Sequence, residues 1–136
     1  MKKIFTLSAF AIFIAVVLTS CQKKDYYYFD EQYWLSRERG EVVYSSGTCN
    51  YYVIDMYNGY TIVRSWGGYK PYEGSIVYGD LSYTGTREMY NYSTGRVFTG
   101  TITDTHLDYF EAQDALNYYC PVGKGQVREF KKAAGK

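Results

Sequence analysis

The single histidine, His106, is the residue whose type most readily suggests chemistry, because an imidazole can bind a metal ion or transfer a proton near neutral pH. Two carboxylates, Asp104 and Asp108, stand two positions away on either side of it. Together they could act as a weak metal site or an acid–base cluster. Side chains two positions apart on a helix do not share a face, so three ligands would not converge there. The alternative, which we favour, places His106 in the first turn of a helix with both acids near its N-terminus. We expect no metal ion and no cofactor.

Acidic side chains are the other catalytic candidates, because two carboxylates a few ångströms apart can cleave a glycosidic bond. Five acids occur in or beside the predicted strands, and nothing in their spacing selects a pair: Glu41, Asp55, Glu73, Asp80 and Glu88. Residues 123–125 (Gly-Lys-Gly) lack the pattern of a phosphate-binding loop. The sequence also contains neither a Gly-x-Ser-x-Gly nor a His-Glu-x-x-His motif, so no catalytic motif stands out.

Aromatic side chains offer a binding surface instead. An Asn58-Gly59 pair between two β-rich runs predicts a tight hairpin in which Tyr57 pairs with Tyr60. Because side chains alternate along a strand, one hairpin face is simpler and is assigned to the core: Tyr52, Ile54, Met56, Thr61, Val63 and Ser65. The other face and the loop after it form a candidate surface for a sugar, a peptide or a partner protein: Tyr51, Asp55, Tyr57, Tyr60, Arg64, Trp66, Tyr69 and Tyr72. The alternative is that a helix or the Tyr-rich segment before the first strand covers this face, since an uncovered aromatic patch of that size favours aggregation.

The N-terminus has the features of an export signal. Lys2 and Lys3 precede an uncharged apolar run, residues 4–18, that is shorter than the roughly 20 residues of a membrane-spanning helix. The residues that end it, 18–21 (Leu-Thr-Ser-Cys), resemble the lipobox of bacterial lipoproteins. This resemblance implies that residues 1–20 are removed and that a lipid on Cys21 anchors the mature chain to a membrane. The alternatives are a permanent N-terminal anchor helix and an ordinary signal peptide with a coincidental cysteine.

The residue after the lipobox bears on location. In the lipoproteins that this sequence resembles, an Asp directly after the cysteine often signals retention in the inner membrane. Gln22 stands there instead, which implies the outer membrane of the cell envelope. Residues 22–25 (Gln-Lys-Lys-Asp) also resemble, with only one acid, the charged export tags of surface lipoproteins in the Bacteroidetes group.

Two cysteines are left if Cys21 carries the lipid. Cys49 and Cys120 could form a disulfide, because the cell envelope is an oxidising compartment. The bridge would close a loop of about 72 residues and stabilise the fold by roughly 4 kcal/mol on the chain-entropy model. The alternative is two separate buried thiols.

Composition sets the class of fold. The chain has 136 residues, enough for one domain, and its 18 Tyr, 13 Gly and 2 Pro are typical of folded β structure rather than disorder. Without Lys2 and Lys3, which belong to the predicted signal peptide, the mature chain has 13 of the 15 basic side chains and all 14 acidic ones. A nearly neutral mature chain has no general electrostatic attraction for nucleic acid.

Six β-rich runs separated by turn residues predict short antiparallel strands: 41–45, 50–57, 60–66, 74–81, 86–92 and 96–103. Residues 93–95 predict a three-residue hairpin loop with Gly95 in its left-handed position. In an OB-like fold, residues 41–57 would instead be one long strand that is bulged near Gly47. The apolar spacing then changes and predicts a helix over 106–119, with Thr105 and Asp108 as its capping box and Pro121 as its stop.

The sequence therefore predicts a mainly β fold, a small antiparallel barrel or roll of five to six strands, OB-like or SH3-like, with one C-terminal helix. The barrel domain would span 41–120. Residues 21–40 would be the tether, in which the aromatic stretch 25–35 is a short helix or a docked arm. Residues 121–136 would be a basic tail, which frays from Gly123 onward.

These features predict a membrane-anchored envelope lipoprotein that acts as a non-enzymatic binding module through its aromatic face. Its partners would be the membrane, through the lipid, and an envelope protein or glycan. A second hypothesis is an inhibitor or protective protein against an envelope-attacking enzyme such as a lysozyme, because small disulfide-bearing β-barrel lipoproteins resemble this chain in outline. The third is a hydrolase of cell-wall glycan that uses two carboxylates.

Overall fold

The computed structural model describes residues 28–132. The predicted signal peptide, the lipobox and the lipidation site Cys21 lie outside the described residues, as do residues 133–136 of the predicted tail. The elements follow in the order α2 (Glu31–Leu35), β1 (Glu38–Ser45), β2 (Tyr51–Met56), β3 (Gly59–Ser65), β4 (Ile76–Gly79), β5 (Gly85–Asn91), β6 (Arg96–Leu107) and α3 (Tyr109–Tyr119).

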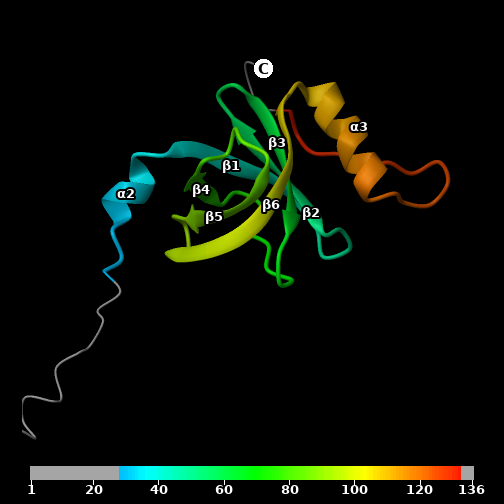
Figure 1. Ribbon diagram of the computed structural model, residues 1–136. Coiled ribbons are helices and arrows are strands. Elements are labelled where there is room, and N and C mark those ends of the chain that lie inside the picture. Colours follow the sequence, from blue (N-terminus) through cyan, green and yellow to red (C-terminus); the bar gives the residue numbers. More distant parts are fainter. Residues whose placement is uncertain (1–27, 133–136) are drawn as a thin grey trace, which may run out of the picture.

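The six strands form a closed antiparallel barrel in the order β1-β2-β3-β6-β5-β4, and β4 pairs back with β1 (Figure 1). The first half of β1 pairs with β4 and the second half with β2, with a bulge between Val42 and Tyr44. A bulge bends a strand and increases its twist, so β1 can pair with β4 at its start and with β2 at its end and thereby close the barrel. The prediction of a small antiparallel barrel with one C-terminal helix is confirmed.

Residues 41–57 are not one long bulged strand, because residues 46–50 turn between β1 and β2. In this turn the amide of Cys49 donates to the carbonyl oxygen of Ser46 at 3.3 Å. The loop between β5 and β6 is also longer by one residue than predicted, since Asn91 pairs with Arg96. Gly95 does have the left-handed conformation expected of it, with φ +70°.

The barrel interior is filled by large side chains from all six strands and the β4–β5 loop. The main members of this interior core are Val42, Tyr52, Ile54, Met56, Val63, Val77, Leu81, Met89, Phe98 and Ile102. The hairpin face assigned to the core from the sequence lies in this interior or at its rim. Gly100 makes room for it, because a Cβ atom there would lie 2.7 Å from both Met89 Cε and Val63 Cγ1.

The β2–β3 hairpin has a different register from the predicted one. Asp55 pairs with Tyr60 and Met56 with Gly59, so Tyr57 and Asn58 form the loop. Gly59 is instead the first residue of β3, where a Cβ atom would lie 2.8 Å from a carbonyl oxygen of β6 and φ is +128°. The register differs by two residues, and because side chains alternate with a period of two, every residue stays on its predicted face.

Helix α3 begins three residues later than predicted, because β6 continues to Leu107. Its capping box is formed by Asp108 and Glu111: each side chain accepts a hydrogen bond from the other residue's amide at 2.8 Å. The predicted box at Thr105 is therefore wrong. His106 lies in β6 with φ +57° and not in the first helical turn. The helix ends at Tyr119 as predicted, and Cys120, just before Pro121, is its C-cap.

An outer layer, formed by α3 and the segment after it, covers the outside of β2 and β3. It buries a second core of Tyr44, Cys49, Val53, Tyr60, Ile62, Ala112, Leu116, Cys120 and Phe130. The Cys49–Cys120 disulfide is present and joins the β1–β2 loop to the end of α3, with the two Cα atoms 5.6 Å apart. The predicted bridge is confirmed.

The segment after α3 is docked through Arg128 and Phe130, contrary to the prediction that it frays from Gly123 onward, although residues 123–127 are exposed. Phe130 is buried against Tyr60, with the two ring centroids 5.3 Å apart. The Arg128 guanidinium donates to the carbonyl oxygen of Cys120 at 2.7 Å and to the Tyr44 hydroxyl at 2.8 Å. A buried ring and charge-assisted hydrogen bonds offset the loss of chain entropy that favours fraying.

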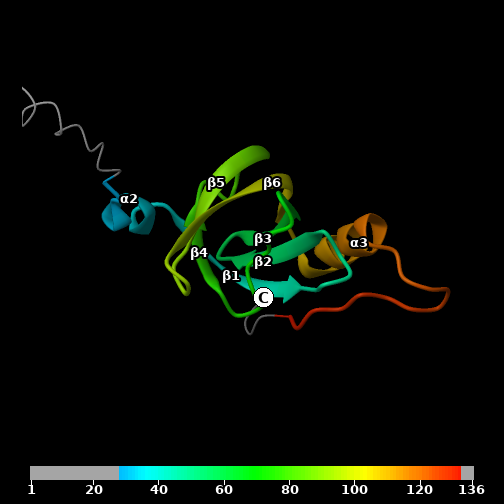
Figure 2. The same cartoon turned by 90° about the horizontal axis from the view of Figure 1, so that it is seen from below.

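Helix α2 lies on the opposite side of the barrel from α3, as Figures 1 and 2 both show. Phe29 and Trp34 pack on Tyr90 of β5, with ring centroids 5.2 and 6.1 Å from that of the tyrosine. The Tyr90 hydroxyl donates to Glu31 at 3.0 Å. The aromatic stretch before β1 thus contains a short helix docked on the barrel, and of the two predicted alternatives the helix is confirmed for residues 31–35.

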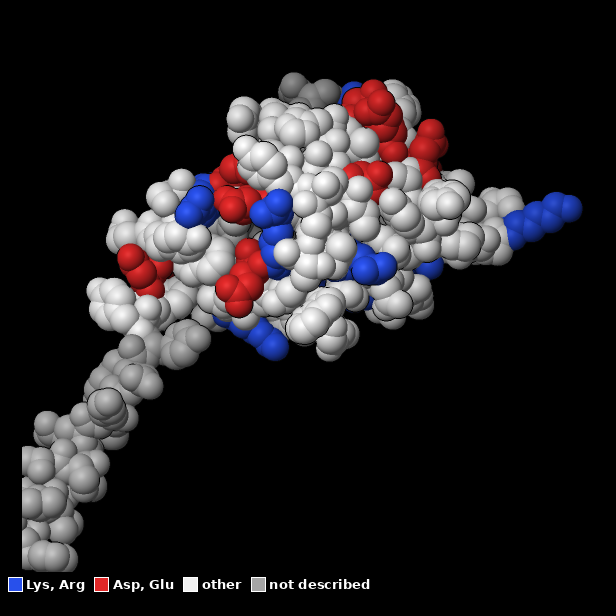
Figure 3. Space-filling model, viewed as in Figure 1, with Lys and Arg blue, Asp and Glu red and all other residues white. Residues whose placement is uncertain are grey.

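On the face shown in Figure 3, acidic and basic side chains are interspersed over much of the surface, and acidic ones gather near α3. Among residues 28–132, no helix combines the length and the apolar character that crossing a bilayer requires.

Candidate functional site

The eight residues of the predicted aromatic surface do not form one open face. The outer layer covers the middle of it: Tyr60 is 1% exposed, and Tyr51 stacks on Tyr119 of α3 with ring centroids 4.3 Å apart. Asp55 is half-buried opposite Tyr60, while Arg64 is exposed near the far end of β3. The covering helix is the alternative that the sequence left open.

The other four residues lie at two opposite ends of the barrel. Tyr57 stands in the turn after β2, and because β3 runs back along β2, Trp66, Tyr69 and Tyr72 come at the other end. Tyr57, Trp66 and Tyr72 are largely exposed, and Tyr69 is half-buried against the interior core. Each end of the barrel has a groove, and we name these the turn groove and the loop groove.

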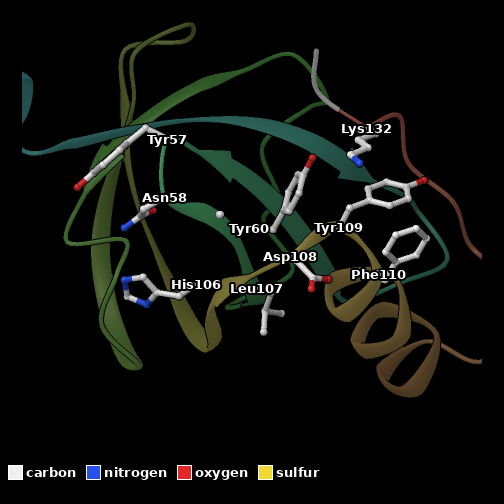
Figure 4. Close-up of a pocket in the computed structure, with 10 residues that line it drawn as sticks. Tyr57, Asn58, Tyr60, His106, Leu107, Asp108, Tyr109, Phe110 and Lys132 are labelled. Carbon is white, nitrogen blue, oxygen red and sulfur yellow. The ribbon is translucent and has the colours of Figure 1, made fainter. Parts of the chain in front are cut away.

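The turn groove has a volume of about 440 Å³ and lies between the β2–β3 turn, the end of β6 and the start of α3 (Figure 4). Tyr57 and His106 stand at one side, Tyr109 and Phe110 at the other, and Tyr60 lies between them. The rings of Tyr57 and Phe110 are 85% and 70% exposed. Large apolar rings that remain in contact with water at the rim of a groove are typical of a binding site.

Polar groups accompany these rings. The Lys132 ammonium lies 5.8 Å from the centroid of the Tyr109 ring and 6.0 Å from that of Phe110, within the range of cation–π attraction. The Tyr109 hydroxyl donates to the carbonyl oxygen of Phe130 at 3.0 Å, which ties the C-terminal segment to the groove. Asn58 lines the groove as well, so hydrogen-bonding groups flank its aromatic wall.

His106 has a left-handed backbone conformation, which costs a non-glycine residue roughly 1–2 kcal/mol. Its neighbours have separate partners: Asp104 accepts from the Tyr119 hydroxyl at 2.8 Å, and Asp108 caps α3. Burial raises the pKa of Tyr119, and the hydrogen bond to Asp104 adds to this effect. Within residues 28–132, no three His, Cys, Asp or Glu side chains are grouped so as to hold a metal ion.

The structure brings together two pairs among the five predicted acids. Glu41 and Asp55 are cross-strand partners in β1 and β2, but neither lines the turn groove or the loop groove. Asp80 and Glu88 share a cavity of about 260 Å³ beside α2, where Arg37 pairs with Asp80 at 3.4 Å. The fifth acid, Glu73, accepts a hydrogen bond from the amide of Ser45 at 3.0 Å.

The loop groove, about 640 Å³, lies between the β1–β2 loop, the long loop after β3 and the β5–β6 loop. Tyr69, Lys70, Tyr72 and Arg96 line it. The Lys70 ammonium donates to the carbonyl oxygens of Ser46 and Cys49. Burial lowers the pKa of Lys70, with a smaller contribution from the nearby charge of Arg128.

The sequence analysis missed several groove residues, among them Phe110, Lys132, Lys70 and Arg96. Phe110 does not share the apolar face of the predicted helix. An apolar ring on the opposite face of an amphipathic helix is expected to be exposed, as Phe110 is. Lys70 and Arg96 follow β3 and β5, and an antiparallel meander places these two loops at the same barrel end. Lys132 belongs to the segment that was predicted to fray.

These grooves and their side chains carry the functional argument by themselves. The sequence matches no protein-family model, no curated protein and no solved structure.

Proposed function

We propose that the protein is a membrane-anchored lipoprotein of the cell envelope that binds a glycan or a partner protein of the envelope without catalysing a reaction. The lipid on Cys21 provides the anchor, and the outer membrane is its expected location. The observation that carries the binding role is the turn groove, where Tyr57 and Phe110 expose their rings on either side of a hollow.

The composition of the turn groove supports recognition of a ligand. Binding sites are mostly apolar, with a few polar groups that orient the ligand. Here Tyr57, Tyr109 and Phe110 supply the apolar surface, while Lys132 supplies hydrogen-bond donors. The Asn58 amide donates to the Ser82 hydroxyl at 3.1 Å. The docked C-terminal segment contacts one wall, because the Tyr109 hydroxyl donates to the carbonyl oxygen of Phe130. Ordering of Tyr109 before the ligand binds lowers the entropy cost of binding.

The position of the groove is compatible with anchoring through Cys21. The first described residue, Tyr28, is seven positions after Cys21, and seven residues span at most about 25 Å. The described chain begins beside α2, on the opposite side of the barrel from α3. A membrane attached on the α2 side would leave the groove at the start of α3 accessible to a ligand.

The test uses mature lipidated protein, purified in detergent and immobilised, to capture components from envelope extracts. We expect Tyr57→Ala and Phe110→Ala each to reduce capture of the bound component at least fivefold. Tyr118→Ala is the matched control, because Tyr118 is 81% exposed on α3 but does not line the groove. Tyr60→Ala is not suitable, since this buried ring supports the fold.

Unchanged capture by both groove variants, with thermal unfolding like that of the wild type, would remove the turn groove as the binding site. The anchor is tested separately by palmitate labelling, which Cys21→Ala should abolish. Label in the Cys21→Ala variant, or no label in the wild type, would contradict the lipoprotein proposal.

A further inference from the structure

The loop groove is positively charged. Its lining includes Lys70 and Arg96 and contains no Asp or Glu. The Arg37–Asp80 ion pair lies at the opposite end of the barrel. Within residues 28–132 neither Lys70 nor Arg96 forms an ion pair, and a nearby acid, Glu73, accepts a hydrogen bond from the amide of Ser45 at 3.0 Å. An anion that enters the groove would therefore meet two cations that no carboxylate of the described residues contacts directly.

Arg96 is exposed but packs its guanidinium on an aromatic ring. Its guanidinium carbon lies 4.1 Å from the centroid of the Tyr69 ring, which is within cation–π distance. The Tyr69 ring is fixed, because its hydroxyl accepts from the Asn91 side chain at 3.2 Å and its centroid lies 5.1 Å from that of Phe98. A planar guanidinium placed in this way can bind a carboxylate through two parallel hydrogen bonds.

Lys70 adds a second, point-like charge. An ammonium group has three donors, and Lys70 directs two of its own to the backbone carbonyls of Ser46 and Cys49. These carbonyls belong to the loop that the Cys49–Cys120 disulfide holds to α3. The third donor remains for a ligand. Burial lowers the pKa of Lys70, so a bound anion would restore favourable interactions that the charged form has lost.

The remaining lining suits a sugar. The Tyr72 ring is 80% exposed beside the two cations, and the hydroxyls of Ser46 and Thr94 border the same space. An aromatic ring can cover the apolar face of a pyranose while hydroxyl groups exchange hydrogen bonds with it. A volume of about 640 Å³ is within the roughly 300–1,000 Å³ of small-ligand sites.

We propose that the loop groove is a second binding site, separate from the turn groove, for an acidic saccharide whose carboxylate pairs with Arg96 and Lys70 while a sugar ring lies on Tyr72. The two grooves are at opposite ends of the barrel, so the proposal stands independently of the ligand of the turn groove.

The experiment is a calorimetric titration of the mature protein with an oligogalacturonate of three to four sugars at low salt. The same oligosaccharide with its carboxylates converted to methyl esters is the matched ligand control. We expect the acidic form to bind at least tenfold more tightly than the ester, because charge-assisted hydrogen bonds are lost with the charge. Raising the ionic strength should weaken binding of the acidic form further.

Variants then locate the site. Arg96→Gln should weaken binding of the acidic form at least tenfold, and Tyr72→Ala should weaken it severalfold. Arg39→Gln is the control, because Arg39 is an exposed arginine of β1 that does not line the groove. Tyr57→Ala should leave this binding unchanged, which separates the result from the proposal for the turn groove. Thermal unfolding by circular dichroism checks that each variant is folded.

Any of these outcomes would overturn the proposal: no heat of binding with the acidic oligosaccharide, equal affinity for its methyl ester, or equal effects of Arg96→Gln and Arg39→Gln. Inorganic phosphate is the last probe. If phosphate binds the groove as tightly as the oligosaccharide does, the site recognises simple anions and the saccharide assignment is wrong.

Discussion

Replacing both Cys49 and Cys120 by alanine should lower the free energy of unfolding of the mature protein by roughly 4 kcal/mol. The two cysteines are 71 positions apart, so the bond closes a loop of about 72 residues. This loop contains strands β2 to β6. In the chain-entropy model a loop of this length lowers the entropy of the unfolded chain by about 15 cal/mol/K, or about 4 kcal/mol at 25 °C.

Urea unfolding of the oxidised wild type and of the double variant, followed by circular dichroism, measures this difference. Reduced wild type is the matched control, because it opens the bond without removing the two buried sulfur atoms. We also expect a larger dependence on urea concentration in both opened forms, since the unfolded chain exposes more surface without the cross-link. A loss below about 1 kcal/mol in both forms would refute the reasoning that loop closure stabilises the fold.

Three further predictions test the outer layer and the hairpin. Phe130→Ala should lower the free energy of unfolding by about 3 kcal/mol in urea, and a loss under 1 kcal/mol would show that the C-terminal segment is not docked. Gly59→Ala should cost more than about 1 kcal/mol, because of its positive φ and the close carbonyl of β6, whereas Gly47→Ala, with open space around its Cβ atom, should be nearly neutral; equal effects would contradict the observed register. Folding raises the pKa of the Tyr119 hydroxyl above the value near 10 that it has in the unfolded chain. The hydroxyl therefore stabilises the fold fully below pH 10, and this stabilisation is lost as the pH rises through the folded-state pKa. Tyr119→Phe should therefore flatten the fall in stability above pH 10, and an unchanged slope in pH-dependent urea unfolding would contradict this.

Local sequence patterns predicted the strands because turn residues separate short β-rich runs throughout residues 41–103. The same patterns could not give the hairpin register, since the position of Gly59 depends on β6, more than 40 residues later in the chain. The start of α3 shows the same limit. Thr105 and Asp108 both fit a capping box in the sequence, and the pairing of Tyr60 with Leu107 decides between them by extending β6.

The candidate site was less predictable, because it depends on which segments cover the barrel. Alternation placed Tyr51 and Tyr60 correctly on the outer hairpin face, yet α3 and Phe130 bury much of that face. The grooves themselves are formed by loops from distant parts of the chain. Their basic members, Lys70 and Arg96, carry no local signal that distinguishes them from ordinary surface residues.

Closure of the barrel limits the ways in which another chain can associate with it. Each of the six strands in the described residues pairs with two neighbours. Where strands are paired on both sides, an extended peptide finds no free edge along which to add backbone hydrogen bonds, so recognition there uses side chains and loops. The short β4–β5 pairing, which joins only residues 77–78 to 90–91, is the weakest part of this closure. If the proposed lipid anchor concentrates copies on a membrane, the paired strands of one copy would offer little of the template by which open sheets assemble into aggregates.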